Sequence, residues 1–229
     1  MSTYEDIWYA ARSTQIVYMP PKLLETFGES RIHYLVLSEE MDQPSAIRLR
    51  SGIVTAERPR IVTPTYFRQK SVENFGEDAR KYFDEVLSKD VNARFVEYGL
   101  KFGKQEFKEE LAHGNVREIA EQAAAEAQDE LDKLSGVVIG FDNAWEISLM
   151  RFITELVQRS LPFNARDIAK RGLFSLDEGV PKAVIEEIED DFNSCSTLDA
   201  AKALGTKLRE YGLFNRFEDR FFDLYRKLK

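Results

Sequence analysis

The sequence predicts an α+β fold, with an N-terminal antiparallel sheet and one or two helices, followed by an all-helical C-terminal portion. Before residue 60, short segments rich in Ile, Val, Tyr and Thr are separated by Pro, Gly, Ser and Asp, which is typical of strands. After about residue 114, apolar residues recur every three or four positions, as in amphipathic helices. We therefore expect a β-rich portion, 1–112, and a helical portion, 113–229. Because no Pro-, Ser- or Gly-rich linker separates them, they should pack together, and one continuous domain is the other interpretation.

Four segments are expected to form the first strands as an antiparallel meander: 14–19, 31–38, 45–50 and 53–57. Between the last two, Ser51 and Gly52 predict a two-residue hairpin turn, because glycine accepts the positive φ that such turns require. In that hairpin Arg48 and Arg50 share one face of the sheet. The hairpin is thus expected to present two arginine side chains side by side.

Helical periodicity is found in six segments: 76–89, 115–134, 144–160, 181–192, 197–211 and 213–228. A further strand is expected at 93–102. Residues 60–63 lie between two prolines and are expected to form at most a short edge strand, because proline cannot donate to a ladder. Asn143 and Asn164, each followed three residues later by an acidic residue, predict helix N-termini.

Composition predicts a soluble globular protein of the cytoplasm. Hydrophobic residues make up 43% of the chain and charged residues 31%, which is ordinary globular usage. Residues 1–12 contain Glu5 and Asp6 and lack an apolar run of signal-peptide length, so secretion is not expected. No stretch approaches the roughly 18 apolar residues of a membrane span. The single cysteine, Cys195, excludes an intramolecular disulfide and fits a reducing compartment.

The charge of the chain is distributed unevenly. The formal net charge is -8, which disfavours bulk binding to nucleic acid or to an anionic membrane because the long-range field repels phosphate. Residues 1–70 nevertheless hold nine Lys and Arg against eight Asp and Glu, so the acidity belongs to the rest of the chain. A small or specific anionic partner is therefore expected in preference to bulk nucleic acid.

Arginines concentrate in the β-rich portion and form the candidate anion-binding site: Arg48, Arg50, Arg58 and Arg60, with Arg68 and Lys70 nearby. Guanidinium groups bind phosphate and carboxylate through two parallel hydrogen bonds, and paired strands would hold them on one surface. The alternative is that these arginines pair with acidic residues of the same chain and contribute little individually.

The motifs of common catalytic sites are weak or absent in this sequence, which contains no Walker loop, no Gly-x-Gly-x-x-Gly and no Gly-x-Ser-x-Gly. Asp90 with Glu106 and Lys108 fits the loose pattern of metal-dependent nucleases, in which carboxylates hold Mg²⁺ beside a lysine. Glu110 and His113 have the spacing of one half of a di-iron site, but a second such pair is missing. We therefore expect no catalytic residue, no resident metal and no cofactor.

Two function classes follow. The first is a non-enzymatic binding or regulatory protein whose arginine-bearing sheet meets a small anionic ligand or a protein partner. The second is a metal-dependent hydrolase or nuclease acting on an anionic phosphodiester. Aromatic residues on 213–228 recur at three- and four-residue spacing, so this helix is expected to be part of the core, with a homodimer interface as the alternative.

Overall fold

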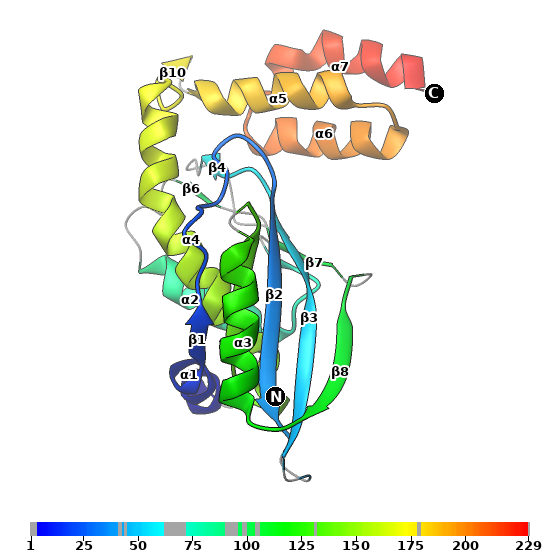
Figure 1. The fold of residues 1–229 in the computed structure, drawn as a ribbon. Coiled ribbons are helices and arrows are strands. Elements are labelled where there is room, and N and C mark those ends of the chain that lie inside the picture. Colours follow the sequence, from blue (N-terminus) through cyan, green and yellow to red (C-terminus); the bar gives the residue numbers. More distant parts are fainter. Residues whose placement is uncertain are drawn as a thin grey trace.

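The computed structural model describes residues 4–40, 43, 45–61, 72–89, 96–97, 100–103, 106–130, 132–177 and 180–228. Within these residues the α+β class is confirmed, with most of the sheet in the first half of the chain and most of the helices in the second (Figure 1). None of the described helices is both long enough and apolar enough to cross a bilayer.

The described residues form a seven-stranded mixed sheet in the order β1-β9-β2-β3-β7-β5, with β8 also pairing with β3. Its strands are β1 (Gln15–Tyr18), β2 (Ser30–Glu39), β3 (Ala46–Ala56), β5 (Val72–Glu73), β7 (Leu100–Phe102), β8 (Lys108–His113) and β9 (Leu134–Ile139). Strand β2 is antiparallel to β3 and parallel to β9. Two short pairs lie outside this sheet: β4 (Arg60–Ile61) with β6 (Val96–Glu97), and β10 (Leu176–Asp177) with β11 (Val180–Pro181).

Helices cover both faces of the sheet. On one face lie α1 (Tyr4–Ser13), α2 (Glu77–Ser88) and α4 (Trp145–Lys170), and on the other lies α3 (Val116–Asp129) (Figure 1). The larger core lies on the α4 face, where β2 contributes Ile32, Tyr34 and Val36. The α3 face holds a smaller core that includes Leu37 and Ile47. This alternation of buried side chains along β2 is what a strand buried on both faces requires.

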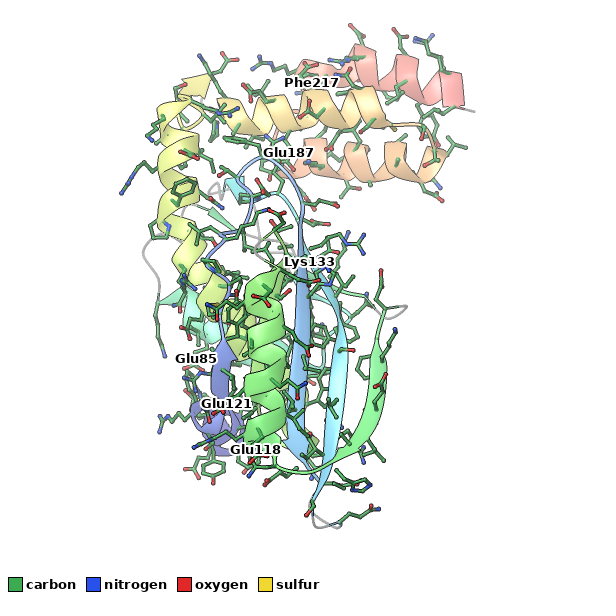
Figure 2. All side chains as sticks on the ribbon, viewed as in Figure 1. Glu85, Glu118, Glu121, Lys133, Glu187 and Phe217 are labelled. Atoms are coloured by element: carbon green, nitrogen blue, oxygen red, sulfur yellow. The ribbon has the colours of Figure 1, made fainter. Side chains whose placement is uncertain are left out.

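The last three helices form a separate layer with a hydrophobic cluster of their own. These are α5 (Lys182–Ser194), α6 (Leu198–Glu210) and α7 (Phe214–Leu228) (Figure 1). Phe217 and Phe221 of α7 are buried, and Phe217 stacks on Phe192 of α5 with ring centroids 5.6 Å apart. Figure 2 labels Phe217 in this layer. The expectation that this aromatic stripe belongs to a core is thus confirmed for Phe217 and Phe221.

The hairpin turn expected at Ser51 and Gly52 is wrong. Both residues lie inside the continuous strand β3, where Gly52 is paired with Tyr34 of β2. A Cβ atom on Gly52 would lie only 2.6 Å from the Tyr34 hydroxyl oxygen. The glycine therefore makes room for a tyrosine ring from the neighbouring strand, which is the other common reason for glycine inside a strand.

Strand β9 was not expected, because the sequence pattern predicts only helices after residue 114. It lies between β1 and β2 and is largely buried, so its apolar residues do not alternate with polar ones. The predicted boundary at residue 112 falls within β8, and the later strand β9 completes the sheet of the first portion. The division into 1–112 and 113–229 stays a prediction.

Neither asparagine caps a helix, although α4 does begin at Trp145, two residues after Asn143. Asn143 lies in the 3-10 helix η2 (Asp142–Ala144), and the N-cap residue of α4 is Ala144, which has no side chain that can accept a hydrogen bond. The Glu146 carboxylate accepts a hydrogen bond of 2.7 Å from the Gly76 backbone N–H at the start of α2. Asn164 lies buried inside α4, where its side chain accepts from the Thr26 hydroxyl and donates to the Leu24 carbonyl. A buried amide satisfied by a distant loop does not serve as a cap.

Candidate functional site: a carboxylate-bound arginine pair

The structure brings Arg48 and Arg50 together on the face of β3 that is turned toward α4. Strand β3 pairs with β2 on one side and with β8 on the other. Arg50 lies opposite Val36 of β2 and Glu109 of β8. Arg48 lies opposite Ser38 of β2 and Leu111 of β8. Residues directly opposite each other in antiparallel strands share a face, so both guanidinium groups lie between the end of β2 and the edge strand β8. The predicted shared face of the two arginines is confirmed, although the turn that led to it is wrong.

Arg50 has a polar partner on each of its three guanidinium nitrogens. Its Nε donates to Glu109 Oε2 at 2.8 Å, its Nη1 to Ser38 Oγ at 3.1 Å and its Nη2 to Asp142 Oδ1 at 2.8 Å. The side chain is only 5% exposed, and its guanidinium carbon lies 5.4 Å from the centre of the Trp145 ring. A buried arginine with this many charge-assisted hydrogen bonds is fixed in one orientation.

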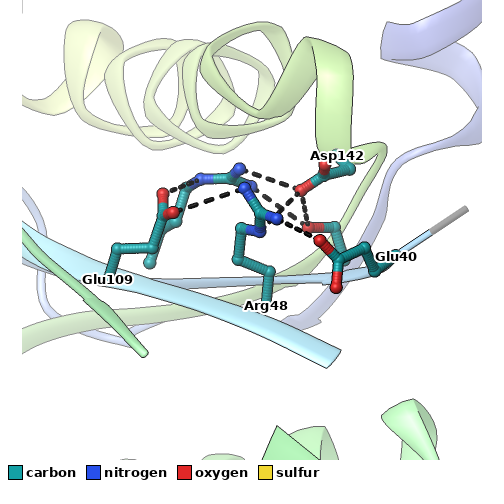
Figure 3. Close-up of polar contacts among 6 residues, drawn as sticks. Glu40, Arg48, Glu109 and Asp142 are labelled. Carbon is teal, nitrogen blue, oxygen red and sulfur yellow. Dashed lines mark hydrogen bonds and ion pairs between the residues drawn. The ribbon is translucent and has the colours of Figure 1, made fainter. Parts of the chain in front are cut away.

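Arg48 shares two of these partners, Glu109 and Asp142, with Arg50 (Figure 3). It forms a hydrogen-bonded ion pair with Glu40 at the end of β2, while Glu109 Oε1 lies 3.4 Å from its Nη1 and Asp142 Oδ1 lies 3.5 Å from its Nε. The hydrogen bond to Glu40 is the main cause that raises the pKa of Arg48 above its usual value. The guanidinium thus stays charged, and three carboxylates surround two positive charges.

The three carboxylates differ in exposure. The side chains of Glu40 and Asp142 are 17% and 15% exposed, and both lie on the inner side of the pair. Glu109 is 40% exposed and lies on β8 at the side of the sheet, where one of its oxygens faces each arginine. Glu109 therefore closes the solvent-facing side of the arginine pair.

Of the other predicted anion-binding residues, only Arg58 has a described side chain, and it lies outside this cluster. Arg58 lies beyond the other end of β3, about 30 Å along an extended strand from Arg48. Its Nη1 is 3.2 Å from Asp190 Oδ2 of α5. Arg60 lies in β4, and its side chain is outside the described part of the chain, as are Arg68 and Lys70. Among the side chains that the structure describes, Arg48 and Arg50 make up the candidate site.

Sequence reasoning did not find the acidic partners of the pair. Glu40 is 8 positions from Arg48, and Glu109 and Asp142 are 59 and 92 positions from Arg50. Only the strand register and the crossover from β8 through α3 to β9 bring them together. A usable signal existed for Glu40 alone, because it directly follows β2, the strand that precedes the arginine-bearing strand and pairs with it.

The residues of the alternative metal site are only partly described. Asp90 lies outside the described residues. Lys108 is the first residue of β8, and Glu106 lies two residues before it, with its Oε1 3.8 Å from Arg31 Nη2. Glu110 and His113 lie in the strand and not in a helix, so an odd spacing of three directs them to opposite faces. Among the described residues, no cluster of three or more His, Cys, Asp or Glu side chains is arranged to hold a metal ion.

Two other hollows could hold a small ligand, and acidic side chains line both of them. The groove between α5 and α6 has a volume of about 560 Å³ and contains Cys195 and Lys207, but the Lys207 ammonium lies 2.6 Å from Glu187 Oε1 and also binds Asp191. The second, about 440 Å³, lies between α3 and the strands β2 and β9; its ionisable side chains are His33, Glu126, Asp129 and Glu130. Neither hollow offers an uncompensated positive charge to an anion.

The comparisons with known proteins add no family. No protein-family model matches this chain, and neither does any curated protein or solved structure. The candidate site is therefore the sole basis for a proposed function.

Proposed function

We propose that this chain is a non-enzymatic binding protein that recognises a carboxylate or phosphate group at the solvent-facing side of the Arg48–Arg50 pair. The observation that supports this proposal is the position of Glu109, which bridges both guanidinium groups from the exposed side of the sheet. A ligand anion would take the place of the Glu109 carboxylate and make the same hydrogen bonds. Arginine pairs suit carboxylate and phosphate because their N–H groups can bind two oxygens at once.

The two inner carboxylates hold the arginines in position while a ligand anion replaces the Glu109 carboxylate. Glu40 and Asp142 would stay bound to the pair when Glu109 leaves, so neither arginine has to be moved or newly desolvated. A site that is already organised loses less conformational entropy on binding. The acidic field of the whole chain weakens nonspecific attraction, which favours a ligand that makes several specific hydrogen bonds.

The cost of displacement limits affinity in the wild-type protein. With Glu109 in place, three carboxylates already outnumber the two guanidinium charges, so an added anion has to compete with a tethered one. Replacing Glu109 by glutamine removes one negative charge and leaves the shape of the site unchanged. The Glu109→Gln variant should therefore bind an anion more tightly than the wild type.

Isothermal titration calorimetry with inorganic phosphate and with citrate tests this proposal. We expect Glu109→Gln to bind at least one of these anions about ten-fold more tightly than the wild type, which corresponds to about 1.4 kcal/mol. Adding Arg48→Gln to that variant should abolish the gain. Glu121→Gln, which removes the same charge from the exposed surface of α3, is the matched control and should behave as the wild type. Equal binding by Glu109→Gln and Glu121→Gln would refute the proposal.

The metal-dependent hydrolase or nuclease stays the alternative from the sequence. It depends on Asp90, which lies outside the described residues, and on Glu106, which is near Arg31. We therefore do not propose it as the function. A homodimer through α7 also stays a prediction, and its strongest feature is Phe222, which is 46% exposed beside the buried Phe221.

A further inference from the structure

The outer edge of strand β8 has no partner among the residues that the structure describes. The strand pairs with β3 on one side, and no described strand or helix lies along its other side (Figure 1). Five of its six side chains are exposed, and Ala112 is half-buried. Leu111, near the middle, is 60% exposed although it lies in a strand of the main sheet. Such an edge presents unpaired backbone N–H and C=O groups that can bind a further strand.

We infer that β8 pairs antiparallel with β8 of a second copy of this chain, with Leu111 opposite Leu111, so that the two sheets become one. This interface adjoins the anion site proposed above and shares Glu109 with it, but the pairing uses the backbone edge of β8 and needs no bound anion. In a symmetric pair of this kind the two-fold axis is perpendicular to the sheet, because each face must continue into the same face of the other copy. Only residues whose numbers differ by an even amount can then lie opposite each other.

The register centred on Leu111 brings compatible side chains opposite each other. It places Glu109 opposite His113, Glu110 opposite Ala112 and Lys108 opposite Gly114 of the second copy. A register centred on residue 110 would instead place Glu110 directly opposite Glu110 of the second copy. Like charges that face each other in this way are destabilising. The register centred on Leu111 has one apolar pair in the middle and no like-charge pair directly opposed.

The charges on β8 do not prevent this pairing as edge charges commonly do. The Glu109 carboxylate already binds Arg48 and Arg50 of its own chain. Lys108 and Glu110 point to the other face, where each would meet a residue with little or no side chain. The remaining unfavourable contact is diagonal, between the two Glu110 carboxylates, at a Cβ separation of about 7–8 Å.

The expected dimer is weak. Pairing of two six-residue strands buries less than the roughly 1,200 Å² of a stable standard-size interface. Dissociation constants in the range of about 10 µM to 1 mM are therefore expected, corresponding to about 4–7 kcal/mol. The dimer should appear only as the protein concentration is raised.

Sedimentation equilibrium over about 10 µM to 1 mM of the full chain tests the inference. We expect a reversible monomer–dimer equilibrium. In the monomer, the new carboxylate of Leu111→Glu lies opposite Arg48, so the chain should stay folded. In the dimer, the same carboxylate would face its counterpart in the second copy, and this repulsion should weaken association at least about ten-fold. Glu110→Gln removes the diagonal repulsion and should tighten association. These opposite effects cannot both come from a general loss of stability.

Phe222→Glu on α7 is the matched control, because Phe222 is also an exposed apolar residue but lies in another layer. It should leave the dimer unchanged. Hydrogen exchange should show that amides of residues 108–113 become protected as the concentration rises. A chain that stays monomeric throughout this range, or a dimer that survives Leu111→Glu, would overturn the inference. A dimer lost in Phe222→Glu would overturn it in favour of the α7 interface.

Discussion

The ring of Phe152 in α4 packs directly against the α-carbon of Gly136 in β9, so that a methyl group at this position would overlap the ring atoms. Phe152 is fully buried, and it lies between the central strands and α4. Only glycine, which has no Cβ atom, allows α4 to lie this close to β9. The contact holds the α4 layer at its present distance from β9.

Replacing Gly136 with alanine should therefore destabilise the protein. Overpacking of a filled core costs about 1–3 kcal/mol, and the upper part of that range is expected because a rigid ring has to move. Urea denaturation measures the loss. Gly28→Ala is the control, because its added methyl group would come no closer than 4.0 Å to any neighbour. An equal effect of the two substitutions would show that the close packing of Phe152 is not what matters.

Arg50→Met should remove about 3 kcal/mol from the free energy of unfolding, because it leaves Asp142 and Glu109 with one guanidinium between them in a partly dry site. The methionine keeps most of the packing volume, so the loss reports the charge. Arg58→Met breaks a much more exposed ion pair with Asp190 and should cost no more than about 1 kcal/mol. Chemical denaturation of both variants checks this difference, and similar losses would contradict it.

Asn164→Ala should destabilise the protein by about 2 kcal/mol. The substitution leaves the Leu24 carbonyl and the Thr26 hydroxyl without the partner that they have now, in a fully buried position. Ser194→Ala, at the exposed end of α5, removes a hydroxyl that bonds only within its own helix turn and should change stability by less than about 0.5 kcal/mol. Thermal unfolding of the two variants is the measurement; a small effect at Asn164 would mean that the backbone there finds other partners.

His33 should make the protein less stable as the pH falls below about 6.5. Burial, followed by the charge of Lys133, lowers the pKa of His33 in the folded state. The unfolded chain therefore takes up a proton before the folded one does, and stability is lost between the unfolded pKa of about 6.5 and the lower folded pKa. Above that window both states are neutral and the effect vanishes.

Melting temperatures of the wild type and of His33→Gln, measured from pH 8 to about pH 5, test this. As the pH falls, the melting temperature of the wild type should decrease more than that of His33→Gln. His113→Gln is the control, because His113 is exposed at the end of β8. Parallel curves for the wild type and His33→Gln would exclude a contribution from this group.

The fold class and most helices could be predicted from local patterns. The expected helix at 76–89 is α2, and the expected strand at 31–38 is β2, because apolar spacing fixes which face of each element is buried. Gly52 misled the prediction because a glycine signals either a turn or close packing, and only the position of Tyr34 on another strand decides between them. The strand β9 was missed because burial on both faces removes the alternation that reveals a strand.

The candidate site was only half predictable. Arg48 and Arg50 are two residues apart in one strand, so the strand period alone places them on one face. Their partners come from β2, β8 and the turn after β9, and no local pattern reports that these three segments meet. Whether an arginine cluster is open or internally paired is therefore a property of the topology, which the spacing of the arginines does not reveal.

The central position of β9 has a consequence for the order in which the chain can fold during synthesis. Strand β1 pairs only with β9 among the described strands, and β2 exposes one edge until β9 arrives. About 120 residues separate β1 from its partner, so the nascent N-terminal half leaves the ribosome as an incomplete sheet with an open edge in its middle. For that interval the edge of β2 that later pairs with β9 stays open, and an open edge of this kind promotes aggregation.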